Sequence, residues 1–235
     1  AGLAGLPDQL RMALVLGAGC PPLMSSIAFA LMFRLDAPLV MLLAVPTILI
    51  VPFTLPPIAL VLLGLDLNID LLDFMLRLAG IVIGGMAVAG LVRALIPKAR
   101  IDAAAEPLDG LAVLLILVFA VAIMDGVGAR LVAEPRLVLW TLALAFAANL
   151  GMQAVATGLF WPAGRRRALS IGLASGNRNM GLLLAALAGA APPDLVLYIA
   201  LGQLPIYMLP LAMKPLYRRL SPSSSGGAVR PGSAP

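Results

Sequence analysis

Residues 111–124 read LAVLLILVFAVAIM, and residues 78–91 read LAGIVIGGMAVAGL. Both stretches lie within longer apolar runs, and neither alternates between polar and apolar positions. An apolar run of about 20 residues, when helical, matches the thickness of the hydrocarbon core of a bilayer. A strand of a transmembrane barrel would instead alternate polar and apolar side chains over a short segment. The two stretches therefore predict an all-α polytopic membrane protein.

The composition of the whole chain favours the same class. Of its 235 residues, 62% are hydrophobic and 11% are charged, whereas about one quarter of a soluble domain is charged. The chain has no histidine, and Cys20 is its single cysteine, which excludes histidine-based catalysis, histidine-ligated metal and an internal disulfide. We find no deep constellation of catalytic groups, so we expect no enzymatic activity and no cofactor. The net charge of +5 lies in short loops, so we expect a lipid bilayer as the partner, and no nucleic acid.

The apolar runs predict seven transmembrane spans, at residues 10–33, 38–64, 70–96, 108–125, 136–160, 167–190 and 194–215. Basic residues follow every second span: Arg34, then Arg93, Lys98 and Arg100, then Arg165, Arg166 and Arg167, then Lys214, Arg218 and Arg219. An excess of Lys and Arg marks cytoplasmic loops. We therefore expect a multi-pass protein of the bacterial cytoplasmic (inner) membrane with a cytoplasmic C-terminus, and a disordered tail over residues 218–235.

Two of these spans contain helix-breaking sequences, GAGCPPLMSS at residues 17–26 and ASGNRNMG at residues 174–181. We expect Pro21-Pro22 to open a new half-helix and Gly176-Asn177 to end one. Irregular backbone at membrane depth is tolerated only inside protein or beside a water-filled cavity. Interrupted helices at corresponding places in two halves of a chain indicate the binding site of a transporter.

The two interrupted spans cross the membrane in opposite directions, which is typical of an inverted repeat. Residues 1–66 would supply the last two helices of the first repeat, with the break near 17–26. Residues 67–217 would supply a complete second repeat of five helices, with the break near 174–181. We expect three helices of the first repeat to be absent from the chain.

The interrupted segments resemble the motifs of the bile acid:sodium symporter family. Residues 20–27, CPPLMSSI, resemble its fourth-helix motif Cys-Pro-Gly-Gly-Thr-Ala-Ser-Asn. Residues 174–182, ASGNRNMGL, resemble its ninth-helix motif Glu-Val-Gly-Met-Gln-Asn-Ser-Gly-Leu. The resemblance implies a ten-helix fold, of which about seven helices belong to this chain, with two discontinuous helices that cross. It also implies secondary active transport of a small organic anion, coupled to Na⁺ or H⁺.

The chain departs from the family at the sodium site. Ala174 stands where the family has its sodium-binding glutamate, Arg178 where it has a glutamine, and Ile27 where it has an asparagine. Ser26 and Asn179 keep the family's residue types. The resemblance leaves four residues as ion ligands: Ser25, Ser26, Ser175 and Asn179. A guanidinium offers no oxygen to a cation, so the usual sodium site is altered.

Arg178 is the only charge that we place near the bilayer centre, where ionisable residues are costly and mark functional sites. We expect substrate-binding groups at Arg178, Asn177, Asn179 and Ser26. Arg178 would bind the anionic group of a substrate or replace the sodium ion electrostatically. The alternative is that Arg178 only bonds the free carbonyls of the broken helix, and both stay open. A non-transporting membrane receptor or scaffold with the same fold is the second functional hypothesis, and the substrate and oligomeric state are left open.

Overall fold

The computed structural model describes residues 8–63, 70–187, 189 and 191–220, and 88% of these residues are helical. Five helical segments are long and apolar enough to cross a membrane. They are α3 (Ala37–Leu63), α4 (Leu71–Leu95), α6 (Ala105–Ile123) with the following α7 (Val127–Ala133), α8 (Pro135–Leu159) and α11 (Pro193–Leu220). The described residues contain no strand, as an all-α multi-pass membrane protein requires.

The other helices are shorter. They are α1 (Asp8–Gly19), α2 (Ser25–Met32), α5 (Lys98–Ala103), α9 (Arg165–Gly176) and α10 (Met180–Leu187), with a 3₁₀ turn η1 (Trp161–Ala163). The first predicted span corresponds to α1 and α2, and the sixth to α9 and α10. The predicted start of the tail at residue 218 is wrong, because α11 continues to Leu220. The rest of the predicted tail and the repeat boundary at residues 66 and 67 lie outside the described residues.

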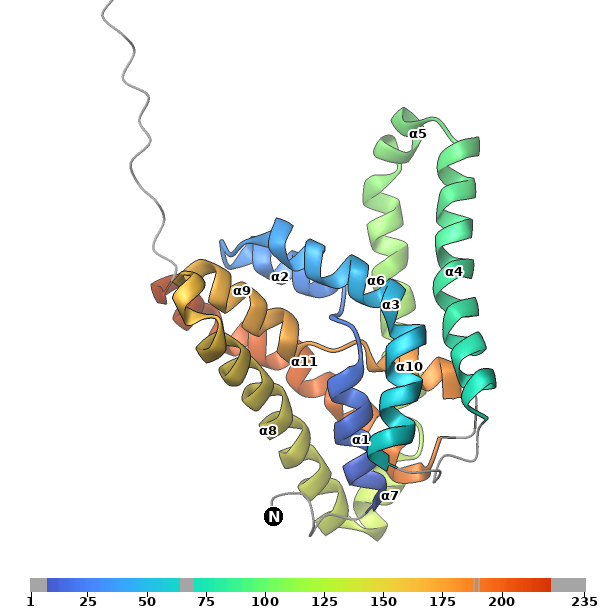
Figure 1. Ribbon diagram of the computed structural model, residues 1–235, viewed down its shortest axis with the longest axis vertical. Coiled ribbons are helices and arrows are strands. Elements are labelled where there is room, and N and C mark those ends of the chain that lie inside the picture. The colour runs from blue at the N-terminus through green and yellow to red at the C-terminus, as the bar shows by residue number, and fades with distance from the viewer. Residues whose placement is uncertain (1–7, 64–69, 188, 190, 221–235) are drawn as a thin grey trace, which may run out of the picture.

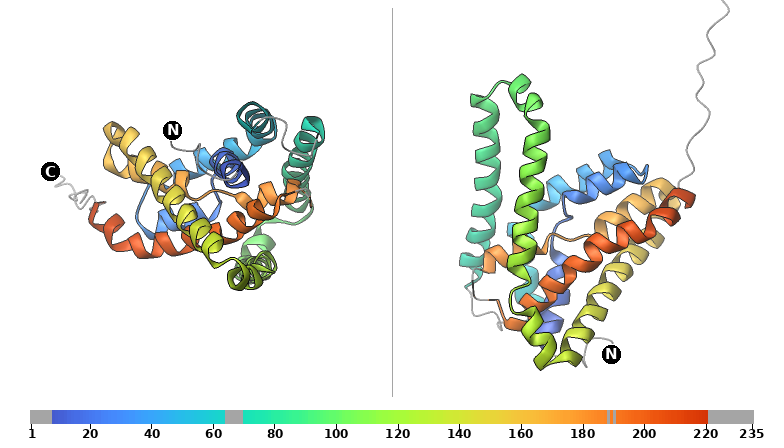
Figure 2. Two further views of the ribbon diagram at one scale, coloured as in Figure 1. Left: turned by 90° about the horizontal axis from the view of Figure 1, so that it is seen from below. Right: turned by 180° about the vertical axis from the view of Figure 1, so that it is seen from behind.

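Three helices, α8, α9 and α11, lie together on one side of the molecule (Figures 1 and 2). On the other side, α4 and α6 form an antiparallel hairpin joined by α5 (Figure 1). The interrupted helix α1–α2 contacts α3 and α11, and α10 contacts α4 and α11. α1 therefore lies against both α3 and α11, and α10 connects the hairpin to α11.

Two hydrophobic clusters hold these elements together. The larger cluster joins α1, α3, α4, α10 and α11 through fully buried side chains such as Leu16, Leu55 and Leu183. The smaller cluster joins α2, α3, α9 and α11, and in it the ring of Phe33 stacks on Tyr217 with centroids 5.1 Å apart. The clusters lie on the two sides of the helix breaks, because α1 and α10 enter the first while α2 and α9 enter the second.

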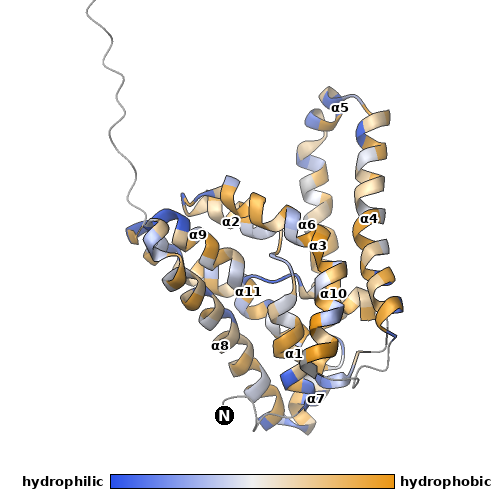
Figure 3. Cartoon of the chain, in the orientation of Figure 1, coloured by the Kyte–Doolittle hydropathy of each residue, from blue (hydrophilic) through white to orange (hydrophobic). Residues whose placement is uncertain are grey.

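The outer surface of the hairpin is apolar. Leu114 and Val118 of α6 are 60% and 65% exposed, and Ile83 of α4 is 60% exposed. Figure 3 shows hydrophilic residues gathered at helix ends, at α5, at the start of α9 and near α7. Contiguous apolar surface of this kind is rare on a soluble monomer but suits a lipid environment. The arrangement of polar ends and apolar sides agrees with a membrane-spanning protein.

Candidate functional site

Two helices are interrupted where the sequence predicts it. The first break separates α1, which ends at Gly19, from α2, which begins at Ser25. The second break separates α9, which ends at Gly176, from α10, which begins at Met180. The residue after α9, Asn177, is extended, with φ −91° and ψ 91°. Gly176-Asn177 therefore ends a helix as predicted.

The two linkers, residues 20–24 and 177–179, bond to each other as an isolated antiparallel bridge centred on Pro22 and Arg178. Two backbone hydrogen bonds of 2.8 Å join them, from the Leu23 amide to the Asn177 carbonyl and from the Asn179 amide to the Pro21 carbonyl. Backbone groups freed from a helix at membrane depth need partners inside the protein. Each broken helix thus supplies partners for the other.

The prediction that Pro21-Pro22 opens a half-helix is wrong. Both prolines lie in the extended linker, and α2 begins at Ser25. The physical reason is the bridge, because pairing of Pro22 with Arg178 holds this segment against the opposite linker in place of a helical turn. A proline has no amide hydrogen to satisfy, so the pair fits an extended segment that offers only carbonyls.

Arg178 ties the ends of the two broken helices together. Its Nε donates a hydrogen bond of 2.6 Å to the Ser175 carbonyl of α9. Its Nη1 donates a hydrogen bond of 2.8 Å to the Cys20 carbonyl, at the end of α1. These are the contacts expected of a structural strut, and neither of them uses Nη2.

The same guanidinium lines a cavity of about 290 Å³. The wall is built from α1, α8, the end of α9, the start of α10 and α11, and is mostly apolar. Polar groups come from Arg178, Asn149 and Tyr198. A mostly apolar cavity with a few polar groups is typical of a site for a small molecule. An arginine at the wall would pair with a carboxylate or another anion by charge-assisted hydrogen bonds.

A buried chain of hydrogen bonds fixes the carbonyl end of α9. Tyr217 donates through Oη to Gln153 Oε1 at 2.6 Å, and Gln153 Nε2 donates to Asn149 Oδ1 at 2.6 Å. Asn149 Nδ2 then donates to the Gly176 carbonyl at 2.9 Å. Asn149 and Gln153 therefore join α8 to α9 and to α11. The chain satisfies a carbonyl that the end of a helix leaves without a partner.

Two glycines allow α9 to approach α8 closely. A Cβ atom at Gly172 would lie 2.9 Å from the Gln153 carbonyl oxygen and closer still to the Thr157 hydroxyl. At Gly176, it would lie 2.9 Å from the Asn149 carbonyl oxygen. Small residues at helix contacts are common in membranes because the backbones can then approach each other. The glycines therefore set the position from which Arg178 enters the cavity.

Some of the predicted site residues lie at the cavity or bond to its surroundings, and the others are buried at the breaks. Of these residues, only Arg178 lines the cavity. Asn179 accepts a hydrogen bond of 3.2 Å from the Leu182 amide through Oδ1 and so caps the start of α10. Ser175 contributes its carbonyl to Arg178. The sequence-based reasoning missed Tyr198, whose one signal was an aromatic hydroxyl within an apolar span.

The remaining predicted residues lie at the break but outside the cavity wall. Asn177 and Ser26 are fully buried, and Ser25 is partly buried. Among the described residues, the Asn177 side-chain atoms and the two serine hydroxyls have no hydrogen-bond partner. Buried polar atoms without partners are costly.

The predicted ion ligands gain no acidic side chain from the fold. Ala174 is 1% exposed and packs in the smaller hydrophobic cluster, where it offers no oxygen. No group of three or more His, Cys, Asp or Glu residues capable of holding a metal lies in the part of the chain that the structure describes. No family model matches the chain, and no curated protein matches it.

Proposed function

We propose that the chain is a secondary active transporter of a small organic anion, with a fold like that of bile acid:sodium symporters and two inverted repeats. The observation that carries the proposal is the position of Arg178, where two interrupted helices meet at the wall of a cavity. A charge at the centre of a bilayer costs about 2.5–3.5 kcal/mol on insertion scales. A substrate anion repays part of that cost by pairing with the guanidinium.

The antiparallel bridge between the linkers supports the inverted repeat, since it requires the two breaks to face each other in opposite chain directions. In the proposal, α1 and α2 form the discontinuous helix of the first repeat, and α9 and α10 that of the second. The breaks form the fixed centre around which the cavity opens alternately to either side of the membrane. The basic helix ends, Arg34 and residues 165–167, face the cytoplasm of a bacterial cell.

The coupling ion in this proposal is Na⁺ or H⁺. The oxygens of Ser25, Ser26 and Asn179 would contribute to a cation site, together with the carbonyl of Ser175. The altered positions Ala174 and Arg178 remove a carboxylate and add a positive charge, so Na⁺ would bind weakly or not at all. We therefore expect uptake to depend little on a sodium gradient.

A second function is favoured by one observation. Two of the three guanidinium nitrogens of Arg178 already bind backbone carbonyls, which is the contact set of a structural strut. In that case the chain would be a membrane receptor or scaffold that keeps the transporter fold and carries no solute. Transport measurements separate the two functions.

The test is counterflow uptake of a panel of radiolabelled carboxylates into proteoliposomes containing the chain, with and without sodium. We expect saturable uptake of at least one carboxylate, lost in Arg178→Gln and weakened in Arg178→Lys. The matched control is Arg77→Gln, which removes an arginine from an exposed ion pair within α4. Uptake that is unchanged in a well-folded Arg178→Gln protein would exclude substrate binding by this residue. The absence of any uptake by the parent protein would favour the receptor or scaffold.

A further inference from the structure

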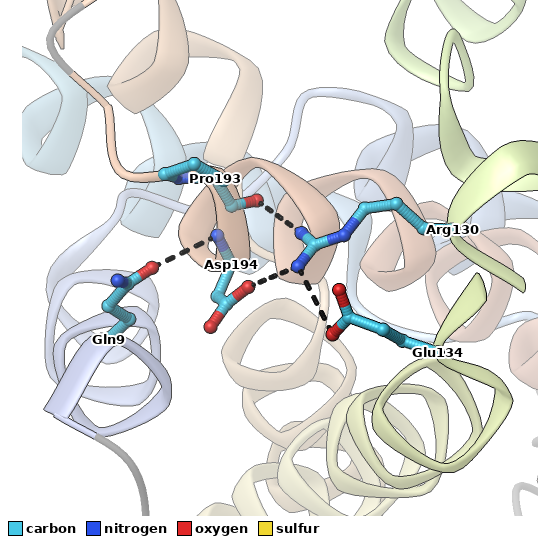
Figure 4. Close-up of polar contacts among 5 residues, drawn as sticks. All are labelled: Gln9, Arg130, Glu134, Pro193 and Asp194. Atoms are coloured by element: carbon cyan, nitrogen blue, oxygen red, sulfur yellow. Dashed lines mark hydrogen bonds and ion pairs between the residues drawn. The ribbon is translucent and has the colours of Figure 1, made fainter.

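A cluster of polar contacts joins three helices far from each other in the sequence (Figure 4). Arg130 of α7 donates through Nη2 to Asp194 Oδ1 at 2.7 Å and through Nη1 to the Pro193 carbonyl at 3.2 Å. The Asp194 amide donates to Gln9 Oε1 of α1 at 3.2 Å. Glu134 Oε2 lies 3.9 Å from Arg130 Nη2. We call these five residues the Arg130 cluster.

The Arg130–Asp194 ion pair differs from the other described pairs in what it connects. The pairs Asp8–Arg11 and Asp73–Arg77 each lie within one helix, three and four residues apart. Arg130 and Asp194 are 64 residues apart and belong to different helices. Their side chains are 28% and 19% exposed, which shields the pair partly from water. The pair therefore holds α7 against the start of α11. An ion pair within one helix cannot hold two helices together.

The cluster lies at one end of the cavity that Arg178 lines. Asp194 is four residues, about one helical turn, before Tyr198 on α11, and Tyr198 lines the cavity. On α1, Gln9 precedes the cavity residues Leu14 and Gly17. A Cβ atom at Gly17 would lie 3.8 Å from the Tyr198 ring, so these two helices run side by side from the cluster to the cavity. The Gln9–Asp194 contact therefore closes the seam between α1 and α11 beyond the cavity.

We propose that the Arg130 cluster is a gate, in which the Arg130–Asp194 pair keeps the cavity closed toward the side of the membrane opposite the basic loops. The proposal rests on the proposed transport function, for which an anion must reach Arg178 from one side at a time. Breaking the pair releases α7 from α11 and allows α1 and α11 to separate. The gate residues touch no solute, so their role is to control access to the cavity.

The position of the charges suits this role. The gate is held by one cation between two carboxylates, Asp194 and Glu134, so loss of the guanidinium leaves two like charges close together. Loss of Asp194 leaves Arg130 with the exposed Glu134 of its own chain segment, which does not bind α11. Removal of either partner is therefore expected to open the gate. Reversal of both charges restores the attraction between α7 and α11.

The test measures access to the cavity and needs no solute. In a Cys20→Ala background, which has no other cysteine, a single reporter Ala145→Cys is placed in the cavity wall, at a position that is only 2% exposed. A membrane-impermeant thiosulfonate reagent is added outside intact cells, and the labelling rate is followed by gel shift. We expect Arg130→Gln and Asp194→Asn to raise the rate about fivefold or more, within the usual range of coupling between sites. The double variant Arg130→Asp/Asp194→Arg is expected to bring the rate back toward that of the parent.

Two controls make the result decisive. Arg77→Gln removes an ion pair of 2.8 Å that lies within α4, and it should leave the labelling rate unchanged. In inside-out vesicles, Arg130→Gln should not raise the rate. An unchanged rate in Arg130→Gln, an equal rise in Arg77→Gln, or a rise only in inside-out vesicles would each overturn the gate. If single variants do not fold, a well-folded charge-reversed variant that labels faster than the parent would also overturn it. If only the gate proposal is wrong, the parent protein still takes up a carboxylate. If the transport proposal is wrong, the parent protein takes up no carboxylate, whatever the labelling rates are.

Discussion

The guanidinium of Arg178 donates through Nη1 to the carbonyl oxygen of Cys20, 158 residues earlier in the chain and 2.8 Å away. This bond connects the end of α1 to the linker that follows α9. The cationic side chain thus has two backbone carbonyl partners, since Nε binds the Ser175 carbonyl as well. A guanidinium fixed in this way presents its remaining donors in a defined direction, which an anion site requires.

The first prediction concerns stability at this bond. Arg178→Gln removes both donors to the carbonyls of Cys20 and Ser175, and hydrogen bonds to charged groups contribute about 1.5–3 kcal/mol each. We expect a clear fall in the thermal unfolding temperature of the purified protein in detergent. The unfolding temperature of Arg178→Lys should fall less, because the lysine ammonium can still donate a hydrogen bond to one of the two carbonyls. If the unfolding temperature of Arg178→Gln equals that of the parent, the guanidinium is not a strut.

The second prediction concerns the contact between α8 and α9. Gly172→Ala places a Cβ atom 2.9 Å from the Gln153 carbonyl oxygen, so the helices must separate. Overpacking of this kind costs about 1–3 kcal/mol, and it should lower the unfolding temperature. The control is Gly151→Ala on α8, where no atom lies within 4 Å of the new Cβ. It should leave stability unchanged or raise it, because alanine favours a helix over glycine by about 1 kcal/mol. An equal effect of both substitutions would contradict the close approach.

Local sequence was sufficient to predict the helices and their breaks. The apolar runs predicted the five long apolar helices to within a few residues, apart from α6 and α7, which divide one predicted span, and the end of α11. Gly176-Asn177 predicted the end of α9, because the tendency of these two residues to end a helix depends on the local sequence. The four prolines at positions 46, 52, 56 and 57 lie inside one continuous helix, α3, whereas Pro21-Pro22 lie in a linker. The difference arises from the opposite linker, which supplies hydrogen-bond partners only at the break.

The site itself depended on contacts that local sequence does not contain. Arg178 stood out in the sequence as a deep charge, but its partner Cys20 lies on another helix. Asn177 and Ser26 were grouped with Arg178 because they are neighbours in the two motifs, yet they do not line its cavity. Asn177 is extended, and successive side chains of an extended segment point in opposite directions, so Asn177 and Arg178 face different surroundings. Ser26 lies in the first turn of α2. Local sequence does not predict the Arg130–Asp194 pair either, because the two residues are 64 positions apart.

The third prediction concerns the buried hydrogen-bond chain. Tyr217→Phe removes the hydroxyl that donates to Gln153 Oε1 and keeps the ring that stacks on Phe33. The amide oxygen then loses its donor in a buried site, at a cost of about 1–3 kcal/mol. We expect a lower unfolding temperature, while Tyr207→Phe on the same helix should have little effect because its ring is only partly buried. Equal unfolding temperatures for the two variants would show that the chain of hydrogen bonds contributes no stability.

The fourth prediction concerns the turn between α2 and α3. Arg34 has φ +60°, the only positive value among the described residues other than glycine. The left-handed conformation costs a residue with a Cβ atom about 1–2 kcal/mol, and glycine avoids this cost. Arg34→Gly should therefore unfold at a higher temperature than Arg34→Ala, which loses the same charge but keeps the Cβ atom. The comparison isolates the backbone from the side chain, since both variants remove the same cation from the same loop. A glycine variant less stable than the alanine variant would mean that the turn adopts another conformation in the membrane.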